Sequence, residues 1–360
     1  MPRRKTAFGG EMGKKYYSAI DIVKIICAVL IVFIHTSPLE SVNGTLNSLL
    51  VNYISRIAVP FFFISSGFLL FGKTDIKKPN GNAVKKYLKR ILFLYLIWSA
   101  VYFPFTVLQI HWSKNPSQAF GIFFNWIKNM FFSAGFGFLW YLPATIVAVA
   151  IVYFLLKRGV SLNTVLFIGV ILYCIGLCGQ SYFGLVSQIP FPDGFKNAVK
   201  AFYDFTVTTR NGVFEGVIFI ALGAKLSQRE KLGSAKRAAA EFVVSMFLLG
   251  CEFAFVSKMG WQLHYDMYIF LIPAAYSLLK FTLCINSKIG IKKIKFLRPY
   301  SSLIYFTHMI PTEIIHIVLR GRKMSSPLLF SIVFITTIAI STAIVFASRT
   351  KKLAFLKKIY

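Results

Sequence analysis

Acidic residues are scarce in this sequence: Asp and Glu together number 12, against 41 Lys and Arg, which gives a formal net charge of +29. Charged residues of both signs make up only 15% of the 360 residues, whereas 56% are hydrophobic. A soluble domain of ordinary composition is less apolar than this. Apolar runs of about 20 residues recur along the whole chain, which is typical of helices that cross a bilayer. The composition therefore predicts a multispanning membrane protein.

Cysteine is also rare, and its spacing argues against two kinds of stabilised fold. The five cysteines lie in or beside apolar runs and form no CxxC pair: Cys27, Cys174, Cys178, Cys251 and Cys284. The sequence thus indicates neither a disulfide framework nor a metal site, and we expect no bound metal. An A-x-A cleavage signal is lacking near the first apolar run, so we interpret that run as a retained helix rather than a signal peptide.

Basic residues alternate along the chain in a way that predicts its topology. Thirty of the 41 Lys and Arg fall in the N-terminal segment, the C-terminal tail and every second connection between apolar runs, and eight fall in the other connections. Such an excess marks the cytoplasmic side of a cell membrane, so both termini are expected there, and a nucleic-acid partner is not needed to explain the charge. The expected spans are 17–37, 47–72, 91–110, 136–156, 162–180, 206–224, 238–257, 262–283, 300–319 and 326–348.

These spans predict an all-α integral membrane protein, with about ten transmembrane helices around a central polar cavity. We expect a single domain over 1–360, with a cytoplasmic segment at 1–16 and a cytoplasmic tail at 349–360, because the connections are too short for a second soluble domain. The aromatic segment 111–135 is expected to lie on the outer surface, and 181–205 to form an external loop or cap.

Ionisable side chains inside the expected spans are the first candidates for a functional site, because a charge at membrane depth usually faces a cavity or a partner. Lys24 and His35 lie eleven residues apart, which on a helix is three turns plus about 20° and about 16 Å along the axis. The pair therefore predicts a polar stripe, although Asp21 and Lys24 also suit the anchoring of a helix end. The candidates are Asp21, Lys24, His35, Arg56, Arg210 and His308, followed by Glu215 and Glu313.

Histidine is the natural general base near neutral pH, so we expect His35, and second His308, to be catalytic. His264 and His316 are metal ligands by type only, because their spacing indicates no site. His111 is expected at the membrane interface.

Arg56 and Arg210 are expected to bind a carboxylate of the protein or of a substrate. Glu215 would lie about 140° from Arg210 on a helix, so each is expected to meet a different helix. Trp140 suits either a membrane-interface aromatic or a wall of the site.

Several motifs resemble those of the acyltransferase 3 family of ten-helix membrane proteins. The Lys24-x10-His35 pattern is similar to the Arg-x10-His signature of that family, and the resemblance covers nearly the whole chain. Four further similar stretches follow in the family's order: VPFFFISSGFLLF (59–71), LWYLPA (139–144), RNGVFEGVIFIALG (210–223) and SSLIYFTHMI (301–310).

This resemblance implies transfer of an acyl group, usually acetyl, from acetyl-CoA or another acyl-CoA to a hydroxyl of a cell-envelope glycan or small molecule. His35 would take the acceptor proton or relay the acyl group, and Lys24 would stand in place of the family arginine near CoA, with a point charge instead of a guanidinium fork. The loop that ends KKYLKR adds Lys86, Lys89 and Arg90 as CoA contacts, or as contacts for anionic lipid.

The stretch SSGFLLF (65–71) lacks the frame of a nucleophile elbow. Its small residues Ser65, Ser66 and Gly67 are therefore expected to permit close helix packing rather than to act as nucleophiles.

Four other stretches resemble the membrane half of the vancomycin-resistance membrane serine racemases, in which an acyltransferase 3 module is fused to a pyridoxal-phosphate racemase domain. They are IHTSPL (34–39), GLCGQSYFGL (176–185), TTRNGVF (208–214) and HYDMYIFLIP (264–273). We expect the racemase domain, its pyridoxal phosphate and racemase activity to be absent from this polypeptide.

The second resemblance implies an alternative, non-enzymatic function: a transport or docking module for L-serine or a similar small amino acid, working beside a separate racemase or cell-wall enzymes. A zwitterion needs a cation and an anion in one pocket. Arg56 or Arg210 would be the cation, and Asp204, Glu215 or Asp266 the anion. Both functions stay open at this point.

Overall fold

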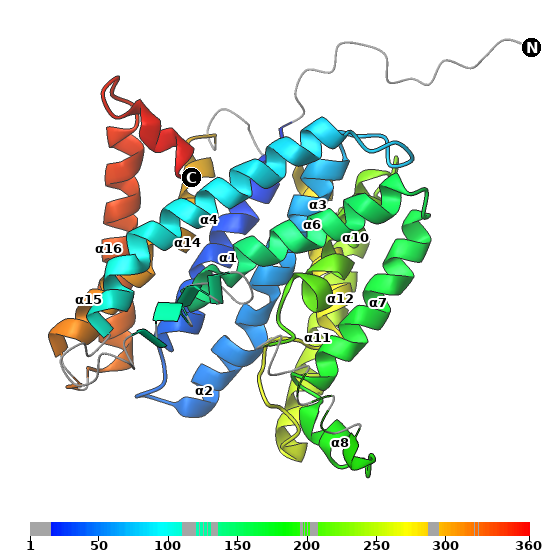
Figure 1. Ribbon diagram of the computed structural model, residues 1–360, viewed down its shortest axis with the longest axis horizontal. Coiled ribbons are helices and arrows are strands. Elements are labelled where there is room, and N and C mark those ends of the chain that lie inside the picture. The colour runs from blue at the N-terminus through cyan, green and yellow to red at the C-terminus, as the bar shows by residue number, and fades with distance from the viewer. Residues whose placement is uncertain are drawn as a thin grey trace, which may run out of the picture.

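The computed structural model describes residues 16–109, 136–194, 208–286, 295–319 and 324–360, with scattered positions at 120–130, 197–201 and 321–322. This part of the chain is a helical bundle without a β-strand, which confirms the all-α class (Figure 1). The helical elements are α1 (Ser18–Thr36), α2 (Gly44–Ser48), η1 (Leu49–Tyr53), η2 (Ile54–Ile57), α3 (Ala58–Phe71), α4 (Gly81–Gln109), η3 (Gly137–Trp140), α6 (Tyr141–Lys157), α7 (Leu162–Cys178), α8 (Phe183–Ser187), η4 (Gly212–Gly216), α10 (Val217–Ser227), α11 (Ala235–Met259), α12 (Leu271–Ile285), η6 (Lys295–Leu297), α14 (Arg298–Thr307), α15 (Met309–Leu319), α16 (Ser326–Ala347) and η7 (Ala354–Lys358).

Seven helical stretches of the described chain are long and apolar enough to cross a bilayer, and α7 and α12 are shorter apolar helices. Each of the ten expected spans overlaps helical structure. In Figure 1 the beginning of α1 and the C-terminal residue lie at the same end of the bundle. We call this the first end, and the end where α1 finishes the second end. The number of crossings and the cytoplasmic position of the termini stay predictions.

The helix α3 runs through the core and packs tightly against α10. A Cβ atom added at Gly67 would lie 2.2 Å from the carbonyl oxygen of Ile220, and one added at Gly223 would lie 2.0 Å from that of Ile64. The two backbones therefore touch at two points where only glycine fits. This agrees with the interpretation of SSGFLLF as a packing motif, and the Ser65 hydroxyl accordingly donates to the Phe62 carbonyl within its own helix.

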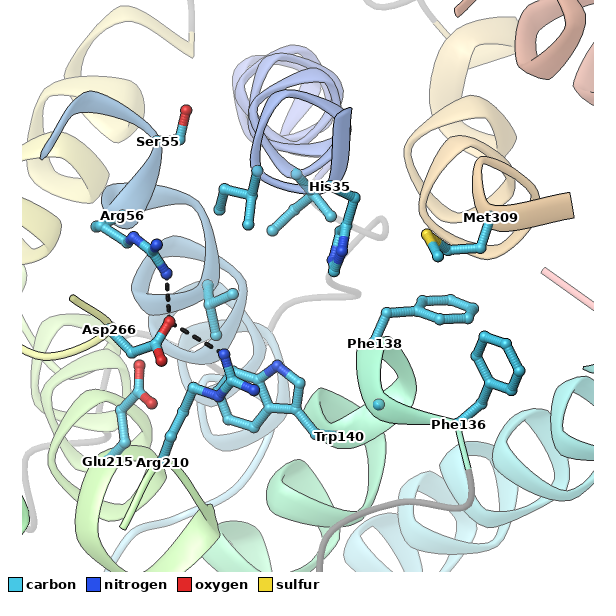
Figure 2. A pocket seen from close by; sticks show the side chains of 14 residues that line it. His35, Ser55, Arg56, Phe136, Phe138, Trp140, Arg210, Glu215, Asp266 and Met309 are labelled. Carbon is cyan, nitrogen blue, oxygen red and sulfur yellow. Dashed lines mark hydrogen bonds and ion pairs between the residues drawn. The ribbon is translucent and has the colours of Figure 1, made fainter. Parts of the chain in front are cut away.

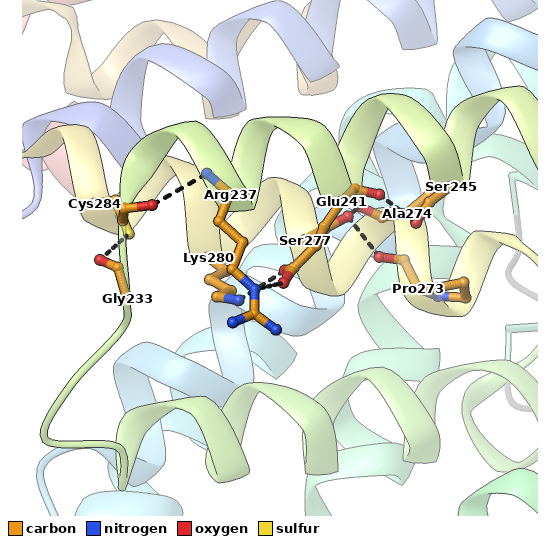
Figure 3. A network of polar contacts seen from close by, with 10 residues as sticks. Gly233, Arg237, Glu241, Ser245, Pro273, Ala274, Ser277, Lys280 and Cys284 are labelled. Atoms are coloured by element: carbon orange, nitrogen blue, oxygen red, sulfur yellow. Dashed lines mark hydrogen bonds and ion pairs between the residues drawn. The ribbon is translucent and has the colours of Figure 1, made fainter.

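An ion-pair network joins α11 to α12 (Figure 3). The Lys280 ammonium lies 2.7 Å from one carboxylate oxygen of Glu241, and the Arg237 guanidinium lies 3.2 Å from the other. Lys280 is only 8% exposed, so the carboxylate compensates a charge that apolar surroundings disfavour. The count of basic residues that predicts the topology places Lys280 in the connection 280–298, although the expected span extends to residue 283. In the structure the helix runs instead from Leu271 to Ile285, because the chain before it forms a loop.

Two helices of the described bundle are interrupted and a third begins with a π turn, and each of these irregular turns carries an ionisable residue. Arg56 lies in the 3-10 turn η2 that follows the π turn η1, and Glu215 lies in the π turn η4. His308 separates α14 from α15, three residues before Pro311, whose missing N–H leaves the Thr307 carbonyl without its helical partner. Irregular backbone at membrane depth is stable where it borders protein or a cavity, and π turns are frequent at functional sites.

The tight contact of α3 with α10 gives a test of the fold. We expect Gly223→Ala to lower the free energy of unfolding by about 1–3 kcal/mol, because the new methyl group must push the two helices apart. Gly44→Ala is the matched control, since an added Cβ there meets nothing within 4 Å. The measurement is the thermal midpoint of the detergent-purified protein. Equal midpoints for the two variants would contradict the packing described here.

Candidate functional site

A cavity of about 360 Å³ lies between α1, the interrupted helix before α3, η3 and the loop before α12. One wall carries an imidazole and the other carries charged groups (Figure 2). Of the residues selected from the sequence, His35, Arg56, Trp140, Arg210 and Glu215 all line this cavity. Charged side chains and an imidazole thus line a partly open cavity between helices, in agreement with the predicted central cavity.

The charged wall is organised by Asp266. The Arg56 guanidinium forms an ion pair with Asp266 Oδ1, and Arg210 Nη1 lies 3.0 Å from the same oxygen. Arg56 also donates through Nη2 to Asn52 Oδ1 at 2.9 Å, one helical turn earlier. The Arg56 and Asp266 side chains are 12% and 14% exposed, and Arg210 is 32% exposed. The acid that meets the arginines is therefore Asp266, one of three that the sequence left open.

Trp140 forms part of the same wall. The Arg210 guanidinium lies over its ring, with Cζ 4.8 Å from the ring centroid. A guanidinium stacked on indole is attracted by the electrons of the ring face and keeps its edge free for hydrogen bonds. Of the two roles that the sequence allowed for Trp140, the structure thus favours a wall of the site.

Glu215 faces the cavity from η4, whose first turn is capped by a side chain. Asn211 Oδ1 accepts hydrogen bonds from the backbone N–H groups of Val213 at 2.9 Å and Phe214 at 3.1 Å. Glu215 is 2% exposed, and its Oε2 has no hydrogen-bond partner in the described chain. As expected, Glu215 and Arg210, both among the described residues, form no ion pair with each other. The angle of about 140° expected between them on a helix does not apply, however, because Arg210 precedes the helix.

Two imidazole rings meet at the opposite wall. The rings of His35 and His308 lie 5.2 Å apart between centroids. His308 Nδ1 is 2.8 Å from the Tyr305 carbonyl and 3.1 Å from that of Ile304. Because carbonyl oxygens only accept, Nδ1 carries the proton, which leaves Nε2 as an acceptor with no partner among the described residues. His308 is completely buried, whereas His35 is exposed to the cavity.

The chain turns sharply just after His35. Helix α1 ends at Thr36, and Ser37 has a φ of 45°. Ser37 is the one non-glycine residue of the described chain with a positive φ. Such backbone is costly for a residue with a Cβ and persists where the surroundings require it. The turn fixes His35 in the last turn of its helix, with its ring at the cavity.

The loop that carries Asp266 is held from α11 by the carboxylate of Glu252. Glu252 of α11 accepts hydrogen bonds from the backbone N–H groups of Ile269 at 2.7 Å and Phe270 at 2.9 Å, and from the Tyr182 hydroxyl at 2.8 Å. Burial raises the pKa of the Tyr182 phenol, so this group donates as a neutral hydroxyl. Glu252 was not among the candidates predicted from the sequence. Its signal was an acid inside an apolar span, the same signal that selected Asp21.

The basic residues expected near CoA, and Asp21, which was expected on the substrate side, lie away from this cavity. Asp21 and Lys24 are on α1 towards the first end, do not line the cavity and are not within ion-pair distance of each other. On α4, Lys86 is exposed and Lys89 borders an open groove between α4 and α6. Arg90 Nη2 donates to the Tyr360 carbonyl oxygen at 2.6 Å. His111 and Asp204 lie outside the described residues, and the roles of all these residues stay predictions.

A multi-pass membrane protein with a histidine and charged groups around an internal cavity is the class that fold and site define. Residues 17–346 match the family model described as "Acyltransferase domain", and the chain belongs to this family, acyltransferase 3.

Three curated relatives are racemases from enterococci. Two proteins named amino-acid racemase from Enterococcus faecalis are 31% and 30% identical over 80% and 83% of this chain. A serine/alanine racemase from Enterococcus gallinarum is 30% identical over 70% of it. The matches cover only 39%, 41% and 35% of those proteins, so the chain spans about two fifths of their length or less. No solved structure matches the chain.

The accessibility of the cavity can be tested with cysteines. In a variant without the native cysteines, we expect His35→Cys to react with a small methanethiosulfonate reagent at least about tenfold faster than Val32→Cys, because thiol reactivity follows exposure. Val32 is fully buried on the same helix, three residues earlier. Labelling is followed by intact-protein mass spectrometry. Slow labelling at both positions would mean that no water reaches the imidazole wall.

Proposed function

We propose that the protein is a membrane acyltransferase that moves an acyl group, acetyl in the simplest case, from an acyl-CoA to a hydroxyl of a cell-envelope glycan or a small molecule. The observation that carries this proposal is the His35 imidazole, which is exposed to a polar cavity inside an apolar bundle and packs against a second imidazole. Membership of the acyltransferase 3 family supports the reaction class.

In the proposed reaction the His35 imidazole takes the proton of the acceptor hydroxyl while the oxygen of that hydroxyl attacks the thioester carbonyl. The carbon–sulfur bond then breaks, and the CoA thiolate leaves and takes up a proton. The unpartnered Nε2 of His308 supports this role, because it is free to accept a hydrogen bond from a protonated neighbour. The backbone carbonyls at His308 Nδ1 hold the ring in the tautomer that this requires.

The acyl-CoA is proposed to enter from the first end of the bundle. Lys24 on α1 and Lys86, Lys89 and Arg90 on α4 offer positive charge there for the phosphates of CoA. Lys24 lies about 16 Å from His35 along the helix axis, so the acyl-bearing arm has to run along α1 to bring its thioester to the imidazole. The acceptor then reaches His35 from the second end.

The proposal is tested by replacing the base. We expect His35→Ala to lower acyl transfer from radiolabelled acetyl-CoA by about 100-fold or more, because general bases contribute 10²–10⁴-fold to such steps. The thermal midpoint should stay close to that of the unchanged protein, since the ring borders a cavity rather than a packed core. His316→Ala is the control, a histidine that does not line the cavity. Full activity of His35→Ala would refute the assignment.

A second candidate is favoured by the ion-pair cluster, because a cavity with two arginines and two carboxyl groups also suits a small zwitterion. The names of the relatives point to amino acids, and on this alternative the protein would carry L-serine or a similar amino acid without chemistry.

A paired assay in proteoliposomes separates the two candidates. On the acyltransferase proposal, labelled acetyl-CoA is bound and consumed, while labelled L-serine does not accumulate. Accumulation of serine without consumption of acetyl-CoA would replace the acyltransferase proposal by the transport one. Empty liposomes and the His35→Ala protein are the controls, and the second should still transport serine if the histidine has no part in transport.

A further inference from the structure

We propose that Arg56 and Arg210 form a binding subsite for an anionic group of the ligand, and that the Asp266 carboxylate is the resident anion with which this group competes. On the proposed function this ligand is the acyl acceptor, and that description rests on the proposed function. The subsite itself rests on the geometry in Figure 2. The ligand class that fits is a small hydroxylated acid, with a carboxylate or phosphate for the arginines and a hydroxyl for the rest of the cavity.

The hydrogen-bond donors of the two arginines outnumber the acceptors that the described residues offer them. Each guanidinium has five N–H donors in a fork that suits a bidentate anion. Here both guanidinium groups reach the same atom, Asp266 Oδ1, and Arg56 has one further partner in Asn52. The Nε atoms of Arg56 and Arg210 are buried without a partner in the described chain. A second anion would find these donors already oriented.

The charges at this wall are also unevenly matched. Within the described ranges two arginines share one carboxylate, although a second one, that of Glu215, lines the same cavity. Among the described residues Glu215 makes no ion pair with either arginine, and its buried Oε2 is unpartnered. Buried polar groups normally have partners, and leaving one without costs free energy. A ligand hydroxyl that donates to Glu215, beside an anion on the arginines, would satisfy both.

The shape of the cavity fits such a ligand. Its volume of about 360 Å³ holds a small molecule. Trp140 supports the flat face of the Arg210 guanidinium, so that the edge of the fork stays available. His35 lines the same space, so a ligand that is bound by its anion on one wall brings a hydroxyl towards the base on the other.

The test uses binding alone, without an acyl donor, in the purified full-length protein. Glycerate and glycerol share a hydroxylated skeleton and differ in the carboxylate, and inorganic phosphate represents the other anion. Binding is followed by the fluorescence of Trp140, obtained as the difference from Trp140→Phe. We expect glycerate or phosphate to bind at least about tenfold more tightly than glycerol, because the guanidinium forks recognise the charge.

Two substitutions should act in opposite directions. Arg210→Gln should weaken anion binding at least about tenfold, whereas Asp266→Asn should strengthen it by a similar factor, because it removes the competing charge. Arg237→Gln is the matched control, since Arg237 is exposed and lies on α11 outside the cavity. If Asp266→Asn does not fold, Arg210→Lys decides, because it keeps the charge, loses the fork and should still weaken anion binding.

Three results would overturn the subsite: equal affinity for glycerate and glycerol, an anion affinity that Arg210→Gln leaves unchanged, or a weaker anion affinity in a folded Asp266→Asn protein. None of them depends on turnover. If the unchanged protein binds anions as expected but transfers no acyl group, the proposed reaction is refuted and the anion subsite is not.

Discussion

The carboxylate of Asp266, shared by two guanidinium groups, is the interaction on which this site depends. It joins three segments that are far apart in sequence: the turn before α3, the chain before η4 and the loop before α12. In an apolar bundle an arginine without a counter-ion is costly, and breaking a buried pair typically costs about 3–5 kcal/mol. The placement of Asp266 therefore fixes where both arginines lie, and Glu252 fixes the loop that carries Asp266.

The interrupted helices have the same physical origin as the cavity. A continuous α-helix packed through small residues, as at the contact of α3 with α10, leaves no room for a ligand. The turns η2 and η4 and the break at His308 depart from α geometry. Side chains in these places therefore have directions that differ from those on a regular helix. Arg56, Glu215 and His308 come from these places. Arg56 and Glu215 line the polar space, and the His308 ring packs against His35, which also lines it.

Much of the fold, but less of the site, could be predicted from the sequence. Hydropathy located the helical segments, since twenty apolar residues in a row have few other solutions. The rarity of ionisable residues in such segments selected His35, Arg56, Arg210 and Glu215, all of which line the cavity. The choice of Asp266 over Glu215 as the partner of the arginines depends on tertiary contacts between distant loops, which a one-dimensional pattern does not contain. Lys280 was counted with a basic connection, because its ion pair with Glu241 joins two helices and is not visible in the sequence.

The basic residues towards the first end and the arginine wall of the cavity lie at different positions along α1. On the proposed function this separation places donor and acceptor on different sides of His35. Lys24 and His35 lie on one rigid helix, about 16 Å apart, so the phosphates of a donor and its reacting thioester must occupy different depths of the membrane. A hydroxyl acceptor at the arginine wall approaches His35 from the second end, opposite to the donor. The lysine that stands where the family has arginine suits this division, because a point charge suffices to hold a phosphate, whereas the oriented forks lie at the other wall, where a small anion has to be placed accurately.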